Sequence, residues 1–577
     1  MSRMSKEIKK VTATQNTVVN FEGGKSFIIS PLQRLKMIAA SSIFGEASFY
    51  RSNVKDGKFF AEVYSRDYIG EDRLFKNEYF NKTTTEVFTE AIDSALSFDF
   101  RATLELAVEL RTKYNMRLNP QVILVRAAIH PDRVKFNQKN PGFFRDIQSK
   151  VIYRADEPSV QAAYYLWLNG SARDAKKNLP TILKRSWAEK LSHLTPYQVM
   201  KYKNSEIGMI NTVRLCHAKS PVIDELMKTG NVQVEEDNET WERLKSAGKT
   251  WMEIIKTVKL GHMALLRNLR NIVTEIEDRE VIKELLDQLK AGVRTGKQFP
   301  FRYKSAWDIF NADRSLNHRM MVMDALEECI DLAIENVPKL PGRTVILTDN
   351  SGSAWNGFTS EYGRTTIAEI DNLSSVIAAV CSDDGFVVKF GTHCRRFDIS
   401  KRNGVLSQAQ AISKDRCDDV GGATEPGVDE FFQWALGEKQ FFDNIIIYSD
   451  LQVGHLYLGN RSWMWGQSGK MMDMSVYDAL KKYRREVNLR VNFFSIQTAG
   501  YDNAVIPEMA YRTALLSGWT GREIEYMVDY VRQWDEIEAE SSPKTTVDGS
   551  KKVETLVGDI NRLTPEEREA LIKAIQK

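Results

Sequence analysis

The sequence lacks paired cysteines and long apolar runs. Its five cysteines are far apart, form no C-x-x-C pair and leave one unpaired in any disulfide scheme. This spacing is typical of a reducing compartment, so we expect a cytoplasmic protein. No charge-free stretch is long enough to span a bilayer, and the basic segment Met1 to Lys10 is followed by polar residues and not by an apolar signal core. We therefore expect no membrane partner.

The motifs of common catalytic sites are missing as well. The seven histidines form no H-E-x-x-H pattern, and no G-x-S-x-G elbow is present. Gly23 to Ser26 resembles the end of a phosphate-binding loop, but Val19 stands where that loop needs its first glycine. Asp349 lacks the second aspartate of a phosphoryl-transferring D-x-D motif. We therefore predict that the chain is not an enzyme.

What the sequence does contain is the composition of an ordinary globular protein. Hydrophobic residues make up 42% and charged residues 27% of the chain, which excludes a disordered or fibrous class. With 577 residues, the chain exceeds the size at which a single hydrophobic core stops growing, so at least two domains are expected. The formal net charge of +3 is nearly neutral for this length. Any attraction to nucleic acid must therefore come from a local basic face.

The first large region is dominated by apolar residues at helical spacing. Such segments recur from about Ser30 to about Pro338 with few alternating strand patterns, and typical ones are Thr85 to Lys113, Gln121 to His130 and Leu179 to Leu191. Successive short helices joined by tight turns are typical of stacked helix pairs. We predict an all-α helical-repeat domain over residues 21–338, preceded by an N-terminal tail of residues 1–20.

The residue pattern changes at Pro338 to Gly342, where two prolines and a glycine end the helical spacing, and this change marks a domain boundary. Apolar strands then alternate with helices. The expected strands are Thr344 to Leu347, Gly385 to Phe390, Asn444 to Tyr448 and Leu489 to Ile496, and the expected helices are Thr366 to Cys381, Val428 to Leu436 and Ser475 to Glu486. This alternation predicts a doubly wound α/β domain with a parallel sheet over residues 341–535. Residues 536–577 are predicted to form a polar linker and a short C-terminal helix beginning near Thr564.

Oxygen-bearing side chains follow the strands of this second domain. Asp349, Ser351 and Ser353 come after the first strand, Thr424 lies in a loop before the third strand, and Asp450 follows the third strand. Because ligands gather at the carboxyl ends of the strands in a doubly wound sheet, these five side chains can converge. Carboxylate and hydroxyl oxygens suit Mg²⁺, so we expect a divalent metal ion as cofactor. The alternative is that the aspartate and serines only form a turn.

A dense run of basic residues lies in the helical region. It extends from Arg173 to Lys203 and contains only two acidic residues, Asp174 and Glu189. Such side chains contact nucleic-acid phosphates, and neighbouring tyrosine and histidine rings offer stacking surfaces for unpaired bases. The candidate contacts in this run and beyond it are Lys184, Arg185, Lys201, Lys203, Arg214, His217 and Arg267. On charge alone, the alternative is a solvated helix face.

The five oxygen-bearing residues resemble a known metal motif. Asp349-Asn350-Ser351-Gly352-Ser353, with Thr424 and Asp450 further along, is similar to the metal-ion-dependent adhesion site (MIDAS) of von Willebrand factor A (VWFA) domains. In that motif, D-x-S-x-S is joined by a distant threonine and aspartate. Ala423 stands before the threonine, where the family often has glycine. The resemblance implies that all five residues bind the metal.

The helical region resembles the TROVE module of Ro autoantigen proteins. Gly261 to Asn271 is similar to the A-L-L-R-N-L segment of that family, and Arg214 to Lys219 is similar to its R-L-S-H-L-K block. The segment ending in Tyr202-Lys203 resembles its T-K-Y-K helix, and Pro300 to Tyr303 resembles its H-P-F block. The blocks occur in the family's order and the resemblance extends from about Phe21 to Arg532, so the chain resembles a bacterial or phage Ro-type protein.

This resemblance implies a HEAT-like ring of helical repeats that is closed by the VWFA domain and is monomeric. It also implies that structured small noncoding RNA (Y RNA) binds a basic outer face, and that ends of misfolded RNA enter the ring for quality control or processing. An exoribonuclease is a further partner that the family implies. Lys201 and His217 stand where the family has its Y RNA contacts, but Ser205 replaces a family arginine. That replacement puts the affinity or the choice of RNA in question.

A second function from another class fits the same residues. The chain can be a protein-interaction scaffold in which the metal at Asp349 completes its ligand shell with a carboxylate of an acidic partner, as A domains of adhesion proteins do. The basic helices are then a solvated surface. Sensitivity of partner binding to EDTA or to RNase distinguishes the two functions.

Overall fold

The structure is a computed structural model that describes most of the chain. The described residues are 17–19, 25–41, 84–169, 178–204, 207–234, 240–296, 298, 300–335, 337–356, 365–449, 453, 456, 458, 474–498, 503–517 and 523–541. The chain divides into two compact units, of which the larger is Ser2–Val528 and the smaller is Asp529–Lys577 with Met1. Each unit is described by itself.

The N-terminal two thirds of the larger unit are rich in helices, as the sequence predicts. Their bounds are α2 Pro31–Ser41, α4 Thr84–Phe98, α5 Phe100–Thr112, α6 Asn119–Ile129, α7 Arg133–Lys139, α8 Phe143–Val151, α9 Glu157–Leu168, α11 Thr181–Ser192, α12 Pro196–Tyr202, α13 Met209–Cys216, α14 Pro221–Thr229, α15 Trp241–Ser246, α16 Trp251–Thr257, α17 His262–Glu275, α18 Arg279–Ala291, α19 Val293–Gly296, α20 Pro300–Ala312 and α21 Arg319–Ile334. None of the helices in the described part of the chain is both long and apolar enough to cross a membrane.

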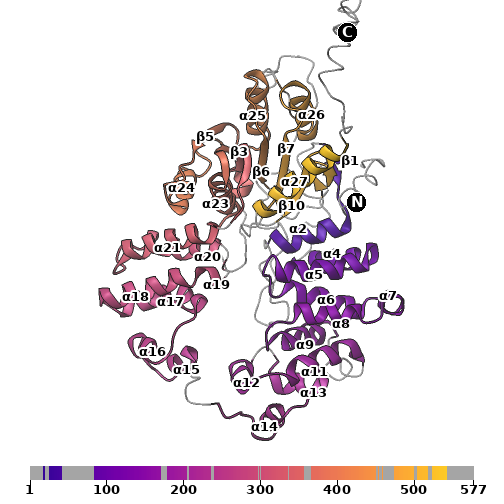
Figure 1. The fold of residues 1–577 in the computed structure, drawn as a ribbon, viewed down its shortest axis with the longest axis vertical. Coiled ribbons are helices and arrows are strands. Elements are labelled where there is room, and N and C mark those ends of the chain that lie inside the picture. The colour runs from indigo at the N-terminus through magenta and orange to yellow at the C-terminus, as the bar shows by residue number, and fades with distance from the viewer. Residues whose placement is uncertain are drawn as a thin grey trace, which may run out of the picture. The chain divides into compact units, whose positions relative to one another are not determined.

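Local capping explains where these helices begin and end. Thr85 to Lys113 is predicted as one helical segment, but the structure divides it at Asp99, whose carboxylate accepts a hydrogen bond from Ala102 N at 2.9 Å and begins α5. A capping box between Thr195 and Gln198 begins α12. Sequential helices then pack in pairs, with α4 against α5, α5 against α6 and α8, and α6 against α9 (Figure 1).

Polar side chains are buried among the apolar ones in this helical core. Trp187 of α11 is fully buried, and its Nε1 donates to Gln161 Oε1 at 2.7 Å. Gln161 Nε2 in turn donates to Gln121 Oε1 at 2.6 Å and to Gln148 Oε1 at 3.0 Å. Four helices, α6, α8, α9 and α11, are therefore fixed in register by one buried network, because each polar atom in a core needs a partner.

A seven-stranded sheet follows the helices, in the order β5-β4-β3-β6-β7-β10-β9. Its strands are β3 Leu340–Asp349, β4 Ser382–Phe390, β5 Cys394–Asp398, β6 Asn444–Ser449, β7 Asn492–Gln497, β9 Met509–Ala510 and β10 Thr513–Ser517, and its helices are α22 Gly352–Asn356, α23 Ile367–Val380, α24 Val405–Ser413, α25 Glu425–Gly437 and α26 Val476–Glu486. The five central strands are parallel, and β5 and β9 are antiparallel edges. The predicted strands and helices are thus found, whereas β5, β9 and β10 were not expected.

Helices cover both faces of this sheet. Val345 and Leu347 of β3 share a core with Phe431 of α25 and Leu480 of α26. Ile346 points to the opposite face, because side chains alternate along a strand, and it is also buried. On that face α23 contacts β3, β4 and β6. The carboxyl ends of β3 and β6 therefore lie together at one edge, where the predicted metal residues follow them.

The N-terminal end of the helical region contacts the end of the sheet domain. Thr17–Val19, assigned to a tail from the sequence, forms β1, which pairs with β2 Lys25–Ile28, and β2 pairs with β8 Asn503–Ala504. Ser30 reinforces this contact, since its N and Oγ donate to the Glu508 carboxylate at 2.8 and 2.9 Å. Residues almost five hundred positions apart are thereby hydrogen-bonded.

The C-terminal end of the helical region contacts the same domain. Glu327 of α21 accepts hydrogen bonds from the backbone N–H groups of Leu406 and Ser407, at 2.8 and 2.7 Å, and thus caps α24. A negative charge at a helix N-terminus is stabilising because that end carries unpaired N–H groups. Lys304 of α20, which is buried, lies 3.7 Å from the carboxylate of Glu369 in α23.

The last described helix, α27, is Glu523–Ser541. It begins in the larger unit and extends into the smaller one. The sequence predicts a linker from residue 536, so the helix extends six residues beyond the expected boundary. The short C-terminal helix predicted near Thr564 lies outside the described residues.

Candidate metal loop and candidate nucleic-acid interface

The candidate metal loop begins at the carboxyl end of β3. Asp349 is the last residue of that strand and is fully buried. Its Oδ1 accepts a hydrogen bond from Ser351 N at 2.8 Å, and its Oδ2 accepts one from Ser449 Oγ at the end of β6. The hydroxyls of Ser351 and Ser353 are 3.1 Å apart. The structure thus brings these three predicted residues together, and it adds Ser449, which the sequence analysis did not select.

The loop that carries Thr424 lies against the same residues. Gly352 N donates to Gly422 O at 2.9 Å. The backbone at Gly391 lies so close to the backbone at Gly421 that only glycine fits at position 391. A Cβ there would lie 2.0 Å from Gly421 O. Thr424 is mostly buried at the start of α25 but does not cap that helix with its side chain. Asp450, the fifth predicted ligand, lies outside the described residues.

The electrostatics of this loop disfavour a bare carboxylate. Burial raises the pKa of Asp349, hydrogen bonds from Ser449 and Ser351 lower it, and the negative charge of Glu425 raises it, with a raised pKa as the result. In the described part of the chain, no group of three or more His, Cys, Asp or Glu side chains could hold a metal ion. A metal in this loop would therefore depend on hydroxyl oxygens in addition to carboxylates.

The candidate nucleic-acid interface is formed by three separate stretches of the helical region. Lys219 N, after α13, donates to Ser192 Oγ at the end of α11 at 3.2 Å. Lys190 Nζ of α11 donates to the backbone oxygen of Tyr153, in the turn between α8 and α9, at 2.8 Å. The next residue of that turn, Arg154, places its guanidinium 5.1 Å from the ring centre of Tyr202 in α12. The turn, α11, α12 and the end of α13 are therefore neighbours.

Lys201 and His217, the two contacts taken from the family, are exposed in this interface. The Lys201 ammonium lies 5.6 Å from the ring centre of Tyr197 and 5.7 Å from that of Tyr202. These distances are within the range of cation–π contacts at the surface. His217 ends α13 in the left-handed conformation, with φ of 58°, which turns the chain towards Lys219.

The remaining predicted contacts differ in their surroundings. Lys203 donates a hydrogen bond to Asn231 Oδ1, so it is already paired within the protein. Arg185 and Arg214 are exposed on α11 and α13, and Lys184 is half-buried. Arg267 is exposed on α17, which packs against α18, α19 and α20. The position of Ser205 and the start of the basic run at Arg173 lie outside the described residues.

Tyr153 and Arg154, which are not among the residues predicted from the sequence, also lie at this interface. The signal available was an aromatic residue followed by a basic one between two helical patterns. His262 lies among basic residues in the sequence, but the structure gives its ring an internal role. His262 Nδ1 lies 3.0 Å from Leu289 O and Nε2 lies 2.9 Å from the Tyr303 hydroxyl. Burial lowers the pKa of His262, so it is not a cationic contact at neutral pH.

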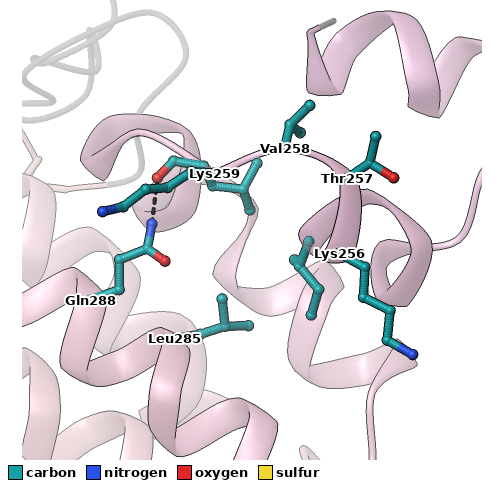
Figure 2. A pocket seen from close by; sticks show the side chains of 8 residues that line it. Lys256, Thr257, Val258, Lys259, Leu285 and Gln288 are labelled. Atoms are coloured by element: carbon teal, nitrogen blue, oxygen red, sulfur yellow. Dashed lines mark hydrogen bonds between the residues drawn. The ribbon is translucent and has the colours of Figure 1, made fainter. Parts of the chain in front are cut away.

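A small pocket lies beside α16 and α18 (Figure 2). Its volume is about 180 Å³, and two lysines, Lys256 and Lys259, are among its lining residues. Figure 2 shows that these two side chains extend in different directions, while Gln288 Nε2 donates to the Leu260 carbonyl at 2.5 Å. Because the pocket does not gather positive charge at one point, we do not assign it an anion.

Comparison with known proteins supports the resemblance inferred from the sequence. The family model of the TROVE domain matches residues 227–323, which include the Gly261 to Asn271 block. The crystal structure of the Deinococcus radiodurans Ro (RSR) protein is similar, with a TM-score of 0.51 and 16% identity, covering 77% of this chain and 93% of that chain. No curated protein sequence matches the chain. The comparisons show a TROVE match over part of the helical region and a fold like that of the Ro protein, in which a helix-rich region is followed by a sheet domain.

Proposed function

We propose that the protein is a Ro-type protein that binds RNA, on the basis of its TROVE match and its likeness to the Ro fold. In this proposal, structured small noncoding RNA of the Y type binds the surface around Lys201 and His217, and single-stranded ends of misfolded RNA are held within a ring for quality control. An exoribonuclease partner is part of the same proposal. The observation that carries it is the local charge of the surface formed by α11, α12 and the turn before α9.

The charge count of this surface supports an anionic ligand. The cations of these three elements are Arg154, Lys184, Arg185, Lys190 and Lys201, and their carboxylates are Asp156 and Glu189. Five positive and two negative charges leave an excess of three, on a chain whose total formal charge is +3. A local excess of this kind attracts phosphates and makes binding strongly dependent on salt.

The proposed ring is supported by contacts at both ends of the helical region. Ser30 pairs with Glu508 near β9, and Glu327 caps α24, so both ends are hydrogen-bonded to the one sheet domain. We propose that this domain, in the manner of a VWFA domain, closes HEAT-like helical repeats into a monomeric ring. The chain is proposed to act without catalysis and in the cytoplasm.

A binding assay with a structured RNA tests the RNA-binding function. The Lys201→Ala/His217→Ala variant is expected to lose about tenfold in affinity, and its dependence of log affinity on log salt should become shallower by about one. Lys283→Ala/Lys414→Ala is the matched control, because both lysines are exposed and lie on α18 and after α24. Equal affinity of the two double variants would show that the surface is wrongly assigned.

The metal loop is proposed to bind Mg²⁺ through Asp349, Ser351, Ser353, Thr424 and Asp450. The described residues fit such an ion: Asp349 is buried with a raised pKa, two serine hydroxyls adjoin it, and the Thr424 side chain does not cap α25. A bound cation would neutralise the carboxylate and offer a positive centre to an acidic group. Calorimetric titration with Mg²⁺ is expected to give heat with the wild type and none with Asp349→Ala, and equal heats would remove the proposal.

A second candidate function is a scaffold that binds an acidic protein partner through this metal. The buried carboxylate at the carboxyl edge of the sheet favours it. Capture of partners from a lysate with EDTA, or after RNase treatment, separates the two functions. Loss with EDTA alone supports the scaffold, and loss with RNase alone supports RNA binding.

A further inference from the structure

We propose that Tyr153 is a stacking platform for an unpaired nucleobase. It makes the surface around Lys201 prefer RNA with a bulged or single-stranded nucleotide over a continuous duplex. The inference rests on the proposed RNA-binding function and names the feature of the RNA that this surface selects. It is carried by the position of the ring, by its fixed geometry and by the charges around it.

Tyr153 is exposed and yet held in place. Its side chain belongs to a residue that is 53% exposed, in the turn between α8 and α9. The Arg111 guanidinium lies over the ring, 4.7 Å from its centre. The backbone is fixed as well, because Tyr153 N donates to Glu157 Oε2 at 2.6 Å and Tyr153 O accepts from Lys190 Nζ at 2.8 Å. An exposed ring that is ordered before its ligand arrives loses little conformational freedom on stacking.

The cation that supports the ring is itself rigid. Arg111 is mostly buried, its Nη2 lies 2.8 Å from Glu157 Oε1, and its Nε donates to Val151 O at 3.2 Å. With Arg111 covering one face of the ring, the exposed part of Tyr153 can receive a planar group from the solvent side. Aromatic side chains and bases stack in this way without reading a particular sequence.

The charges next to the platform suit a nucleotide backbone. Arg154 follows Tyr153 in the chain and places its guanidinium 5.1 Å from the centre of the Tyr202 ring. The Lys201 ammonium lies 5.6 Å from the ring centre of Tyr197 and 5.7 Å from that of Tyr202. A base on Tyr153 would therefore have cations within reach of its flanking phosphates. The neighbouring carboxylates of Asp156 and Glu157 are each paired with arginine, so they leave the phosphates unopposed.

An unpaired base is favoured over a duplex because of base accessibility. In A-form RNA the major groove is too deep for side chains, and the faces of stacked, paired bases are covered by their neighbours. Only a bulged, looped or terminal base presents a free face to a tyrosine. The competing explanation is that Tyr153 only shields the Arg111–Glu157 ion pair from water, and the experiment separates these roles.

The experiment uses the full chain and two hairpin RNAs that differ by one bulged 2-aminopurine nucleotide. The wild type is expected to bind the bulged hairpin about five- to tenfold more tightly than the continuous one, and binding should quench the fluorescence of the bulged base through stacking. Tyr153→Leu keeps an apolar cover over Arg111 but removes the aromatic face, so it should lose both the preference and the quenching. Its affinity for the continuous hairpin should stay within about twofold. Tyr153→Trp should keep both signals.

Each remaining outcome contradicts a specific statement. If Tyr153→Leu retains the preference and the quenching, the ring is only a cover for the ion pair and the inference is wrong. If the wild type binds both hairpins equally without quenching, the inference fails while RNA binding stands. If the wild type binds neither hairpin, the proposed function itself is overturned. Should Tyr153→Leu fold poorly, loss of quenching in Tyr153→Trp would overturn the platform independently.

Discussion

The buried ion pair between Arg111 and Glu157 gives a prediction whose size follows from its surroundings. Glu157 is fully buried, Arg111 is almost so, and the two are 2.8 Å apart. In Glu157→Leu, the guanidinium keeps Val151 O as an acceptor but loses its counter-charge, and the N–H groups of Tyr153 and Arg154 lose their acceptor. Leaving a buried charge unpaired costs about 3–5 kcal/mol. We expect that loss in the free energy of unfolding of the helical region at neutral pH.

Replacement of Arg111 should lower the free energy of unfolding by less than replacement of Glu157, and the loss should depend on pH. In Arg111→Met, Glu157 can take up a proton, which an unpaired arginine cannot lose. Burial already raises the pKa of Glu157, the charge of Arg111 lowers it, and the variant therefore raises it further. A carboxyl whose pKa is higher in the folded state binds more protons there, so stability falls as the pH rises from the ordinary value of 4.5 through the folded value. The cost of Arg111→Met should thus shrink on acidification, by about 1.4 kcal/mol for each added pKa unit.

Urea unfolding followed by far-UV circular dichroism, at neutral pH and near pH 4.5, measures these differences. Arg111→Met/Glu157→Leu is the control, because it leaves no buried charge and should cost less than Glu157→Leu alone. If Glu157→Leu is no less stable than Arg111→Met at neutral pH, the unpaired buried charge is not the source of the loss. If the destabilisation by Arg111→Met is the same at both pH values, Glu157 does not take up a proton in that variant.

Three further predictions concern other parts of the chain. Hydrogen bonds, of which the one from the Thr250 backbone N–H is the strongest, lower the pKa of Glu253 to about 2. The contribution of this carboxylate to stability is therefore full above its ordinary pKa of 4.5 and is lost as the pH falls towards 2. An NMR titration of the Glu253 carboxyl group should report that low pKa. Glu327→Ala should speed hydrogen exchange of the first backbone amides of α24 by about tenfold, since the cap contributes about 1–2 kcal/mol, whereas Glu328→Ala should leave them unchanged. Gly296→Ala should destabilise by about 1–3 kcal/mol, because its Cβ would lie 2.3 Å from the fixed His262 ring, while Gly437→Ala meets no atom within 4 Å and should be neutral in thermal unfolding.

Much of the fold could be predicted from local patterns in the sequence. Continuous apolar strands such as Asn444 to Tyr448 are buried on both faces, and this pattern is readable without knowing their neighbours. The position of the metal loop could also be predicted from the sequence, because the end of a strand fixes where Asp349 and its serines lie. Strands β1, β2 and β8 were not predictable in this way, since each is two to four residues long and exists only through pairing across the chain.

The nucleic-acid surface was predictable in its charge and not in its detail. Lys201 was selected for its charge, but its contacts with Tyr197 and Tyr202 depend on the rotamers of neighbouring residues on one short helix. Tyr153 depends on Arg111, which lies more than forty positions before it and is held by a carboxylate behind it. His262 lies among basic residues in the sequence, while its actual partners come from later helices. The role of each of these side chains depends on residues that are distant in sequence, and a single sequence does not show which distant residues are in contact.

The contact between Ser30 and Glu508 also sets an order of events during synthesis. Its two partners are separated by 478 positions, so at about 5–20 residues per second the ribosome needs roughly 25–100 s to deliver the second one. For that interval, strand β2 has no β8 beside it and presents an unpaired edge, which is a site for association with other chains. Fragments of the helical region that stop before Asn503 should therefore aggregate less when they also begin after residue 28, because they then lack strand β2.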